Sequence, residues 1–202
     1  MIKKKLCSNC RKEKQLKSFS NDSKHGKQSW CRVCQSERYR TPEYKLTNAL
    51  NQARIRARKV GLPANLTNNE YRDFLNNMYL AETHCIIETG NNNPQLGHWL
   101  PLSIGHGGTV LGNLFPQDGI INSSWYNRNP YDWVKTQPKR VQNRFKVLEL
   151  VLAQANGLHT NDFKAFTSWC FDNQRSIAEA EADPRSSLEI WKEAIHKQKV
   201  PC

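Results

Sequence analysis

The sequence lacks long apolar runs, internal repeats and low-complexity segments. No stretch reaches the about 18 apolar residues that a membrane-spanning helix needs. Residues 1–6 also lack the apolar run of a signal peptide. We therefore expect no membrane partner and a cytoplasmic location.

Acidic residues are scarce in one part of the chain only. Residues 1–60 hold 17 Lys and Arg against 4 Asp and Glu, a balance of +13, whereas residues 61–202 hold 13 against 14, a balance of −1. The whole net charge of +12 therefore comes from the first part. A short basic run is often only a solvated surface, but an excess of this size favours a polyanion as partner, and we expect double-stranded DNA.

The cysteines do not suggest disulfides. Four of the seven form two CxxC pairs, Cys7 with Cys10 and Cys31 with Cys34, separated by twenty residues. Four thiolates at this spacing suit a tetrahedral zinc ion in a reducing compartment. Residues 1–36 contain little apolar mass, so a structural Zn²⁺ would contribute the missing folding free energy. We predict an N-terminal zinc ribbon; redox-active or free cysteines are the alternative.

Cationic side chains surround the predicted ribbon and continue on a helix expected over residues 42–59, which Pro42 begins and residues 61–63 end. Cations near the end of a helix complement its dipole. Four of them within six residues exceed what capping needs, so phosphate contact is the better interpretation. The residues expected to bind nucleic acid are Lys27, Arg32, Arg54, Arg56, Arg58 and Lys59.

The rest of the chain mixes short strands with helices, so the expected class is α+β and mostly helical. Thr67 and Glu70 form a capping box that begins a second helix. The later elements are expected as strands at 84–88 and 96–100, and as helices at 118–126, 138–156, 161–172, 174–182 and 186–198. The predicted organisation is a zinc ribbon at 1–40, a basic helix and helical connector at 41–82, a central core at 83–137 and a helical region at 138–202.

Residues 95–129 carry the side chains with catalytic potential. His98 lies on a short strand, a mobile glycine-rich loop follows, Asn113 ends the loop, and Asn122 lies on the next helix. Hydrolysis of a phosphodiester requires a base to activate water and a cation to stabilise the leaving oxygen. His98 can act as the base, Asn113 can orient it, and the amide oxygen of Asn122 can bind Mg²⁺ or Mn²⁺. Each residue alone is more often structural, and their order is the stronger evidence.

This order resembles the HNH endonucleases, the ββα-metal nucleases, in their His-Asn-Asn form. The matching segments are His-Trp-Leu-Pro-Leu at 98–102, Gly-Gly-Thr at 107–109, Gly-Asn-Leu at 112–114 and Ile-Asn-Ser-Ser at 121–124. A zinc ribbon followed by a basic helix is similar to phage-encoded and homing-type members. The resemblance implies a ββα-metal core and a metal-dependent DNA endonuclease that nicks or cuts. It also implies that His98 is the general base, Asn113 fixes the loop and Asn122 binds the catalytic metal.

Two positions depart from the family pattern and leave a second hypothesis open. Trp125 stands after the Asn-x-Ser segment, where the family often has a lysine. The acidic residue that usually precedes the catalytic histidine is Gly97 here. Glu88 or Asp118 could replace its carboxylate. The alternative is a weakened or inactive protein of the same fold that binds DNA, RNA or a protein partner without cutting.

Overall fold

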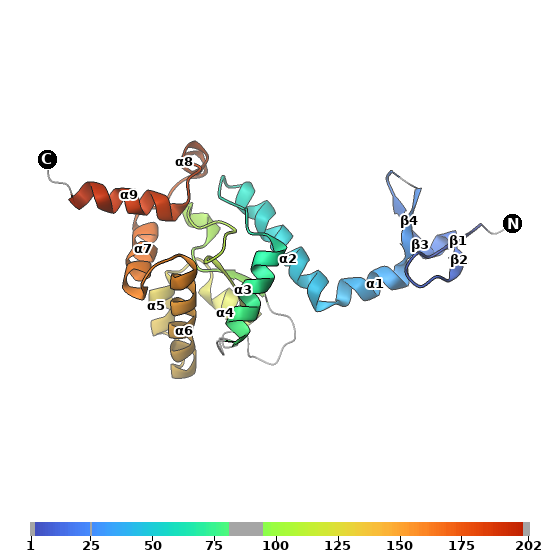
Figure 1. Ribbon diagram of the computed structural model, residues 1–202, viewed down its shortest axis with the longest axis horizontal. Coiled ribbons are helices and arrows are strands. Elements are labelled where there is room, and N and C mark those ends of the chain that lie inside the picture. The colour runs from blue at the N-terminus through green and yellow to red at the C-terminus, as the bar shows by residue number, and fades with distance from the viewer. Residues whose placement is uncertain (1–2, 25, 81–94, 200–202) are drawn as a thin grey trace. The chain divides into compact units, whose positions relative to one another are not determined.

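The chain is α+β and mostly helical, as predicted. The computed structural model describes residues 3–24, 26–80 and 95–199, and Figure 1 shows their elements. It divides into two compact units, Met1–Asn48 and Ala49–Cys202. The expected strand at 84–88, and Glu88 with it, lies outside the described residues. Among the described helices, none combines the length and apolarity that crossing a membrane would take.

The first unit consists of two small sheets and one helix. Its elements are β1 (Lys4–Leu6), β2 (Glu13–Gln15), the 3₁₀ turn η1 (Leu16–Ser18), β3 (Phe19–Asp22), β4 (Gly26–Cys31) and α1 (Arg32–Arg40). β1 pairs with β2 and β3 with β4, both antiparallel. Its buried core consists of Cys7, Cys31, Cys34 and Phe19, with Trp30 packed against them. A core made largely of cysteines depends on whatever holds the thiols together.

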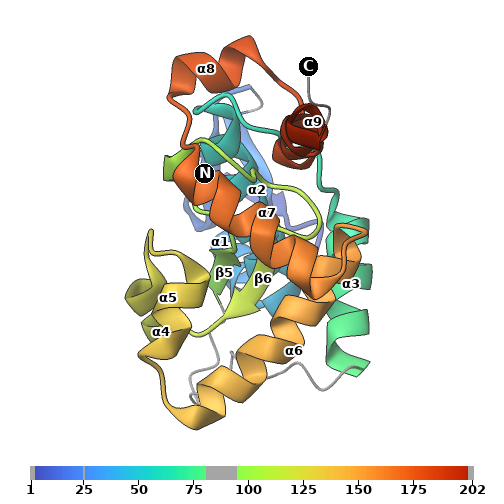
Figure 2. The same cartoon turned by 90° about the vertical axis from the view of Figure 1, so that its left-hand side faces the viewer.

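The second unit combines one strand pair with helices. The helix α2 (Pro42–Arg58) contains the boundary between the units, and the elements that follow are α3 (Asn68–Leu80), β5 (Gln95–His98), η3 (Leu102–Ile104), β6 (Leu114–Gln117), α4 (Gly119–Trp125), α5 (Pro130–Lys135), α6 (Lys139–Ala155), α7 (Thr160–Asp172), α8 (Ile177–Ala182) and α9 (Ser187–Lys199). Figure 2 shows β5 and β6 side by side, flanked by α4 and α5. Their antiparallel register pairs Gln95 with Gln117 and His98 with Leu114.

Side-chain caps explain where several helices begin. At α3, the Thr67 hydroxyl accepts from the Glu70 N–H at 3.2 Å and Glu70 accepts from the Thr67 N–H at 2.8 Å, which confirms the predicted capping box. A second capping box starts α8, where Ser176 bonds reciprocally with Glu179. This helix begins at Ile177, three residues later than predicted, because its cap is Ser176.

One buried tryptophan organises the second unit. Trp99, 1 % exposed, directly follows β5. Its indole lies 5.1 Å from the Phe145 ring on α6 and 5.2 Å from Phe163 on α7, measured between ring centroids. Its Nε1–H donates to the Thr167 hydroxyl at 2.9 Å, so the polar edge of the ring is satisfied as well. The strand pair is thereby fixed to α6 and α7.

The glycine-rich loop is packed, in contrast to the mobile loop expected from sequence. His106 within it is fully buried, with Nδ1 3.0 Å from the Ser187 hydroxyl and Nε2 2.7 Å from the Asn173 carbonyl oxygen. The Arg175 side chain donates to the Gly105 carbonyl at 2.9 Å. The helices at the C-terminal end of the chain hold the loop, a long-range effect that the local glycine content does not reveal.

The central position of Trp99 yields a stability prediction. Trp99→Ala leaves a cavity among aromatic rings and removes the hydrogen bond that the indole donates to the Thr167 hydroxyl, which keeps its bond to the Phe163 carbonyl. We therefore expect the free energy of unfolding to fall by about 3–5 kcal/mol. Urea denaturation followed by circular dichroism measures this. Ile177→Ala, at an exposed site, is the control and should change stability by less than about 0.5 kcal/mol. A comparable loss in both variants would contradict the central role of Trp99.

Candidate functional site

Four thiols meet in the first unit. The sulfur atoms of Cys7, Cys10, Cys31 and Cys34 all lie within 4.8 Å of one another. The Sγ–Sγ distances are 3.9 Å between Cys7 and Cys34 and 3.5 Å between Cys31 and Cys34. An edge of a tetrahedron with metal–sulfur bonds of about 2.3 Å measures about 3.8 Å. The four cysteines therefore fit the geometry of one tetrahedral metal ion.

The charges around the thiols also favour a cation. Burial would raise the pKa of Cys7, but backbone N–H groups, first that of Cys31 at 3.3 Å, lower it to about 6. A hydrogen bond from Asn9 acts to lower the pKa of Cys34, whereas burial and the neighbouring thiols raise it to about 11. Close thiols cannot all ionise without compensation. A metal cation would remove this conflict.

Lys14 supplies part of that compensation. Its ammonium group donates to the Cys31 sulfur at 3.2 Å, and this hydrogen bond is the main reason why the pKa of Lys14 is raised. A charge-assisted hydrogen bond from an ammonium group stabilises a thiolate and offsets its negative charge. This role of Lys14 was not predicted from the sequence, because Lys14 on β2 and Cys31 on β4 belong to two different sheets and are seventeen residues apart.

The second candidate site lies on β5, β6 and α4. His98 is the last residue of β5, and its Nε2 is buried with no hydrogen-bond partner among the described residues. Burial, with a smaller effect of the Arg56 charge, lowers the pKa of His98 to about 4. Its imidazole is therefore neutral at physiological pH. A neutral imidazole nitrogen without a hydrogen bond is free to accept a proton.

Asn113 fixes the loop between the two strands. Its side-chain Oδ1 accepts from the Leu100 N–H at 2.8 Å, and its Nδ2 donates to the Gly108 carbonyl at 2.8 Å. No hydrogen bond of the described residues joins it to the His98 ring. Asn113 therefore holds the loop at Leu100 and Gly108 and does not orient the His98 ring by a direct hydrogen bond.

Asn122 belongs to a cluster of side-chain amides. Its Nδ2 donates to Gln95 at 2.8 Å, and its Oδ1 accepts from Gln117. Gln117 is 1 % exposed, and its Oε1 has no hydrogen-bond partner among the described residues. Sequence analysis missed both glutamines, although their cross-strand pairing on one face follows once the register is known.

Gln117 also occupies the space beside Gly97. A Cβ built on Gly97 would overlap the Gln117 side-chain amide. A neutral amide from the neighbouring strand therefore fills the space that a side chain at position 97 would need. Asp118 accepts from the Ile120 N–H at 2.7 Å as the N-cap of α4, so one of its oxygens is engaged in capping.

Amide oxygens and an imidazole are acceptable ligand types for a hard cation, but they bring no negative charge. Mg²⁺ is usually bound through one or two carboxylates together with substrate phosphates. Among the residues that the structure describes, the four thiols are the group of three or more His, Cys, Asp or Glu side chains that could hold a metal. The amide cluster therefore fits a divalent metal in atom type and leaves most of the anionic charge to a bound phosphate.

The predicted phosphate-binding residues divide into two kinds. Arg32, Arg56, Arg58 and Lys59 are exposed. In contrast, Arg54 donates through Nε to the Leu66 carbonyl at 2.7 Å and through Nη1 to Asn51 at 2.7 Å. The Lys27 ammonium donates to Asn21 at 2.7 Å. Arg54 and Lys27 thus have structural contacts that compete with phosphate binding.

The thiol geometry predicts the metal content. We expect about one metal ion per purified chain, since four thiolates satisfy one tetrahedral ion. Chelation should make residues 1–48 susceptible to proteolysis while residues 95–199 stay protected, because the core of thiols found among the described residues lies in the first unit. Cys31→Ser should lose the ion, whereas Cys170→Ser, at a buried cysteine of the second unit, should retain it. Equal metal content in both variants would contradict the assignment.

The buried state of His98 predicts how it titrates. Its imidazole should remain neutral from about pH 8 to about pH 5, which nuclear magnetic resonance of the ring measures directly. An unfolded histidine binds its proton near pH 6.5. As the pH falls, the histidine of the unfolded chain is protonated before that of the folded chain, which favours unfolding. The stability that depends on neutral His98 is therefore lost as the pH falls from about 6.5 towards about 4. A ring that titrates near pH 6.5 would contradict the burial of His98 in the free protein.

Comparison of the chain with protein-family models, with curated proteins and with solved structures found no match. The resemblance to the HNH endonucleases thus rests on the order of His98, Asn113 and Asn122 in the sequence. The function has to be argued from the chemistry of the two sites.

Proposed function

We propose that this protein is a metal-dependent DNA endonuclease with an HNH-type site on β5, β6 and α4, and with the N-terminal unit as a zinc ribbon that binds DNA. The observation that carries the proposal is the buried, unpartnered Nε2 of His98 at the end of β5. A general base must be unprotonated at the working pH and must not be occupied by another donor. The pKa of about 4 satisfies the first condition.

In this proposal each residue of the site has one task. His98 accepts a proton from the attacking water, and Asn113 holds the loop that follows His98. Asn122 and Gln117 are the residues that would hold a Mg²⁺ or Mn²⁺ ion through their amide oxygens. Such an ion, when bound, stabilises the negative charge that develops on the leaving oxygen. Because the amides are neutral, we expect weak metal binding that strengthens when a DNA phosphate is present.

The basic part of the chain brings DNA to this site. Exposed cations at the end of α2 and directly after it, namely Arg56, Arg58 and Lys59, belong to the same unit as His98. Arg56 is close enough to affect the pKa of His98. The first unit, residues 1–48, contributes thirteen Lys and Arg against four Asp and Glu. Phosphate contacts of this kind bind without sequence preference and weaken as salt rises.

A second function is favoured by the neutral amide cluster. A site in which Gln117 replaces the carboxylate beside Gly97 could bind nucleic acid without cutting it. On this alternative, His98 and Asn122 stabilise the fold and the basic surfaces carry the activity. The two functions differ in whether the unmodified protein breaks a phosphodiester bond.

A plasmid-nicking assay with Mg²⁺, Mn²⁺ or chelator tests the endonuclease. We expect metal-dependent nicking, and His98→Ala should lower its rate by about 10²–10⁴-fold while DNA affinity persists, because only the base is removed. His196→Ala, at an exposed histidine on α9, is the matched control and should cut normally. Equal cutting by both variants would exclude His98 as the base.

The position beside His98 separates the two functions. Gly97→Asp alone would force an aspartate against Gln117, so the informative variant is Gly97→Asp combined with Gln117→Ala. This pair restores a carboxylate with space for it, and we expect a lower metal requirement. If the unmodified protein binds DNA but cuts with no divalent metal, while the double variant cuts, the binding function is the correct one.

A further inference from the structure

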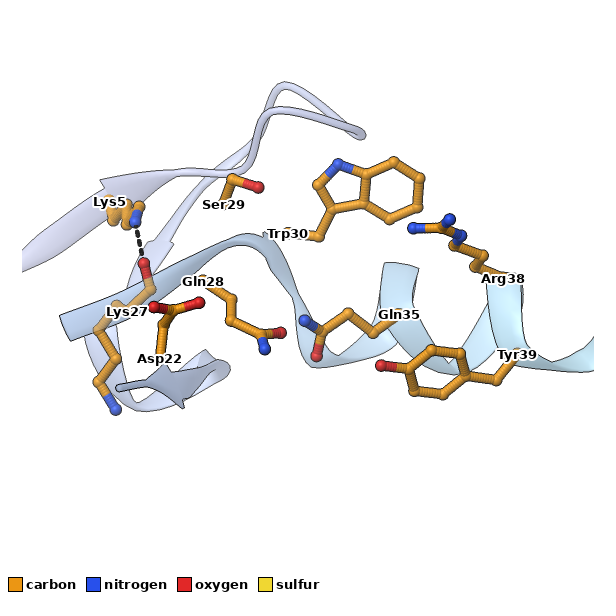
Figure 3. Close-up of a pocket in the computed structure, with 9 residues that line it drawn as sticks. All are labelled: Lys5, Asp22, Lys27, Gln28, Ser29, Trp30, Gln35, Arg38 and Tyr39. Atoms are coloured by element: carbon orange, nitrogen blue, oxygen red, sulfur yellow. Dashed lines mark hydrogen bonds between the residues drawn. The ribbon is translucent and has the colours of Figure 1, made fainter. Parts of the chain in front are cut away.

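A groove on the first unit lies outside the nuclease site and has its own chemistry. It has a volume of about 520 Å³, within the usual range of ligand pockets. Figure 3 shows Trp30, Arg38 and Tyr39 toward one end, Lys5, Lys27 and Asp22 toward the other, and the amides of Gln28 and Gln35 between them. All of these residues belong to the unit Met1–Asn48.

Planar groups gather at one end of the groove. The Arg38 guanidinium lies 5.4 Å from the centre of the Trp30 ring and 5.5 Å from that of Tyr44. The Tyr39 and Tyr44 rings are 4.8 Å apart. Trp30 is half-buried against the cysteine core, whereas Tyr39 is 49 % exposed. The result is a firmly anchored indole, a guanidinium and an accessible phenol ring on one surface.

Such a set suits unpaired nucleobases. Aromatic rings and guanidinium planes stack on the faces of bases in single strands, and side-chain amides can bond the edges of bases. In a duplex the same faces are covered by neighbouring base pairs, so double-stranded DNA cannot stack its bases on this end of the groove. The thirteen Lys and Arg of residues 1–48, against four Asp and Glu, attract the backbone. At the far end the ammonium groups of Lys5 and Lys27 already donate to the Lys27 carbonyl and to Asn21, and Asp22 opposes an anion. The aromatic end is therefore the point of contact.

We propose that the groove binds an unpaired base of a single-stranded nucleic acid by stacking on Trp30, Arg38 and Tyr39. The inference rests on the proposed nucleic-acid partner and adds to it a strand preference. A protein that holds a single-stranded segment in this unit selects substrates with unpaired bases, such as junctions, flaps or loops. The sequence pattern of cations alone does not distinguish these from a duplex.

Fluorescence anisotropy with the full-length chain tests the proposal. The probes are a labelled oligothymidine, an oligouridine of the same length and a duplex of the same length. Tyr39→Ala should weaken oligothymidine binding by about five-fold or more, since stacking contributes at least this much per base. The duplex affinity should change by less than about two-fold, because phosphate contacts remain. Oligouridine reports whether RNA binds equally well.

Two further variants separate stacking from charge and from folding. Tyr39→Phe keeps the ring and should bind as the unmodified protein does. Arg38→Lys keeps the charge but loses the plane, so it should weaken single-strand binding alone. The metal content of each variant shows that the first unit is folded. If the protein binds duplex DNA, and if Tyr39→Ala and Arg38→Lys bind the single strand as tightly as the unmodified protein does, this inference alone is wrong. Absence of binding to every probe would overturn the proposed function as well.

Discussion

The packing of Trp99 is the interaction on which the second unit depends. Its indole contacts the rings of Phe145 on α6 and Phe163 on α7. Trp99 is also the residue that directly follows His98 in the chain. Because Trp99 is held rigidly in the core, the backbone of its neighbour His98 has little freedom to move. The helical region at 139–199 therefore contributes to the candidate site by fixing the strand pair and by holding the glycine-rich loop through Ser187 and Arg175.

The first unit is too small for a large apolar core and is stabilised differently. It buries three cysteines and Phe19, with few other apolar side chains, and its thiols shift the pKa values of one another. An apolar core is stable by itself, whereas clustered thiols need a cation to be stable when ionised. The two units should therefore respond differently to chelators, although they are joined by one continuous helix, α2.

The amide cluster around Gly97 sets the balance between the two candidate functions. The Gln117 amide beside Gly97 is neutral, so it attracts a divalent cation less than a carboxylate would and also repels DNA phosphate less. His98 keeps the properties of a base in either case, because its pKa is set mainly by burial and not by the amides. A base without a strong metal site is compatible with slow cleavage or with binding alone.

The sequence by itself determined the local features: the two CxxC pairs, the capping box at Thr67 and Glu70, and the order of most helices of the second unit. These depend on residues close together in the chain, so spacing and capping chemistry are sufficient to predict them. Only the tertiary structure revealed the Gln117 amide beside Gly97, the Lys14 contact with Cys31, the structural bonds of Arg54 and the burial of His106. Each of these contacts joins residues from different segments, and their distances are set by strand register and helix packing, which no local pattern specifies.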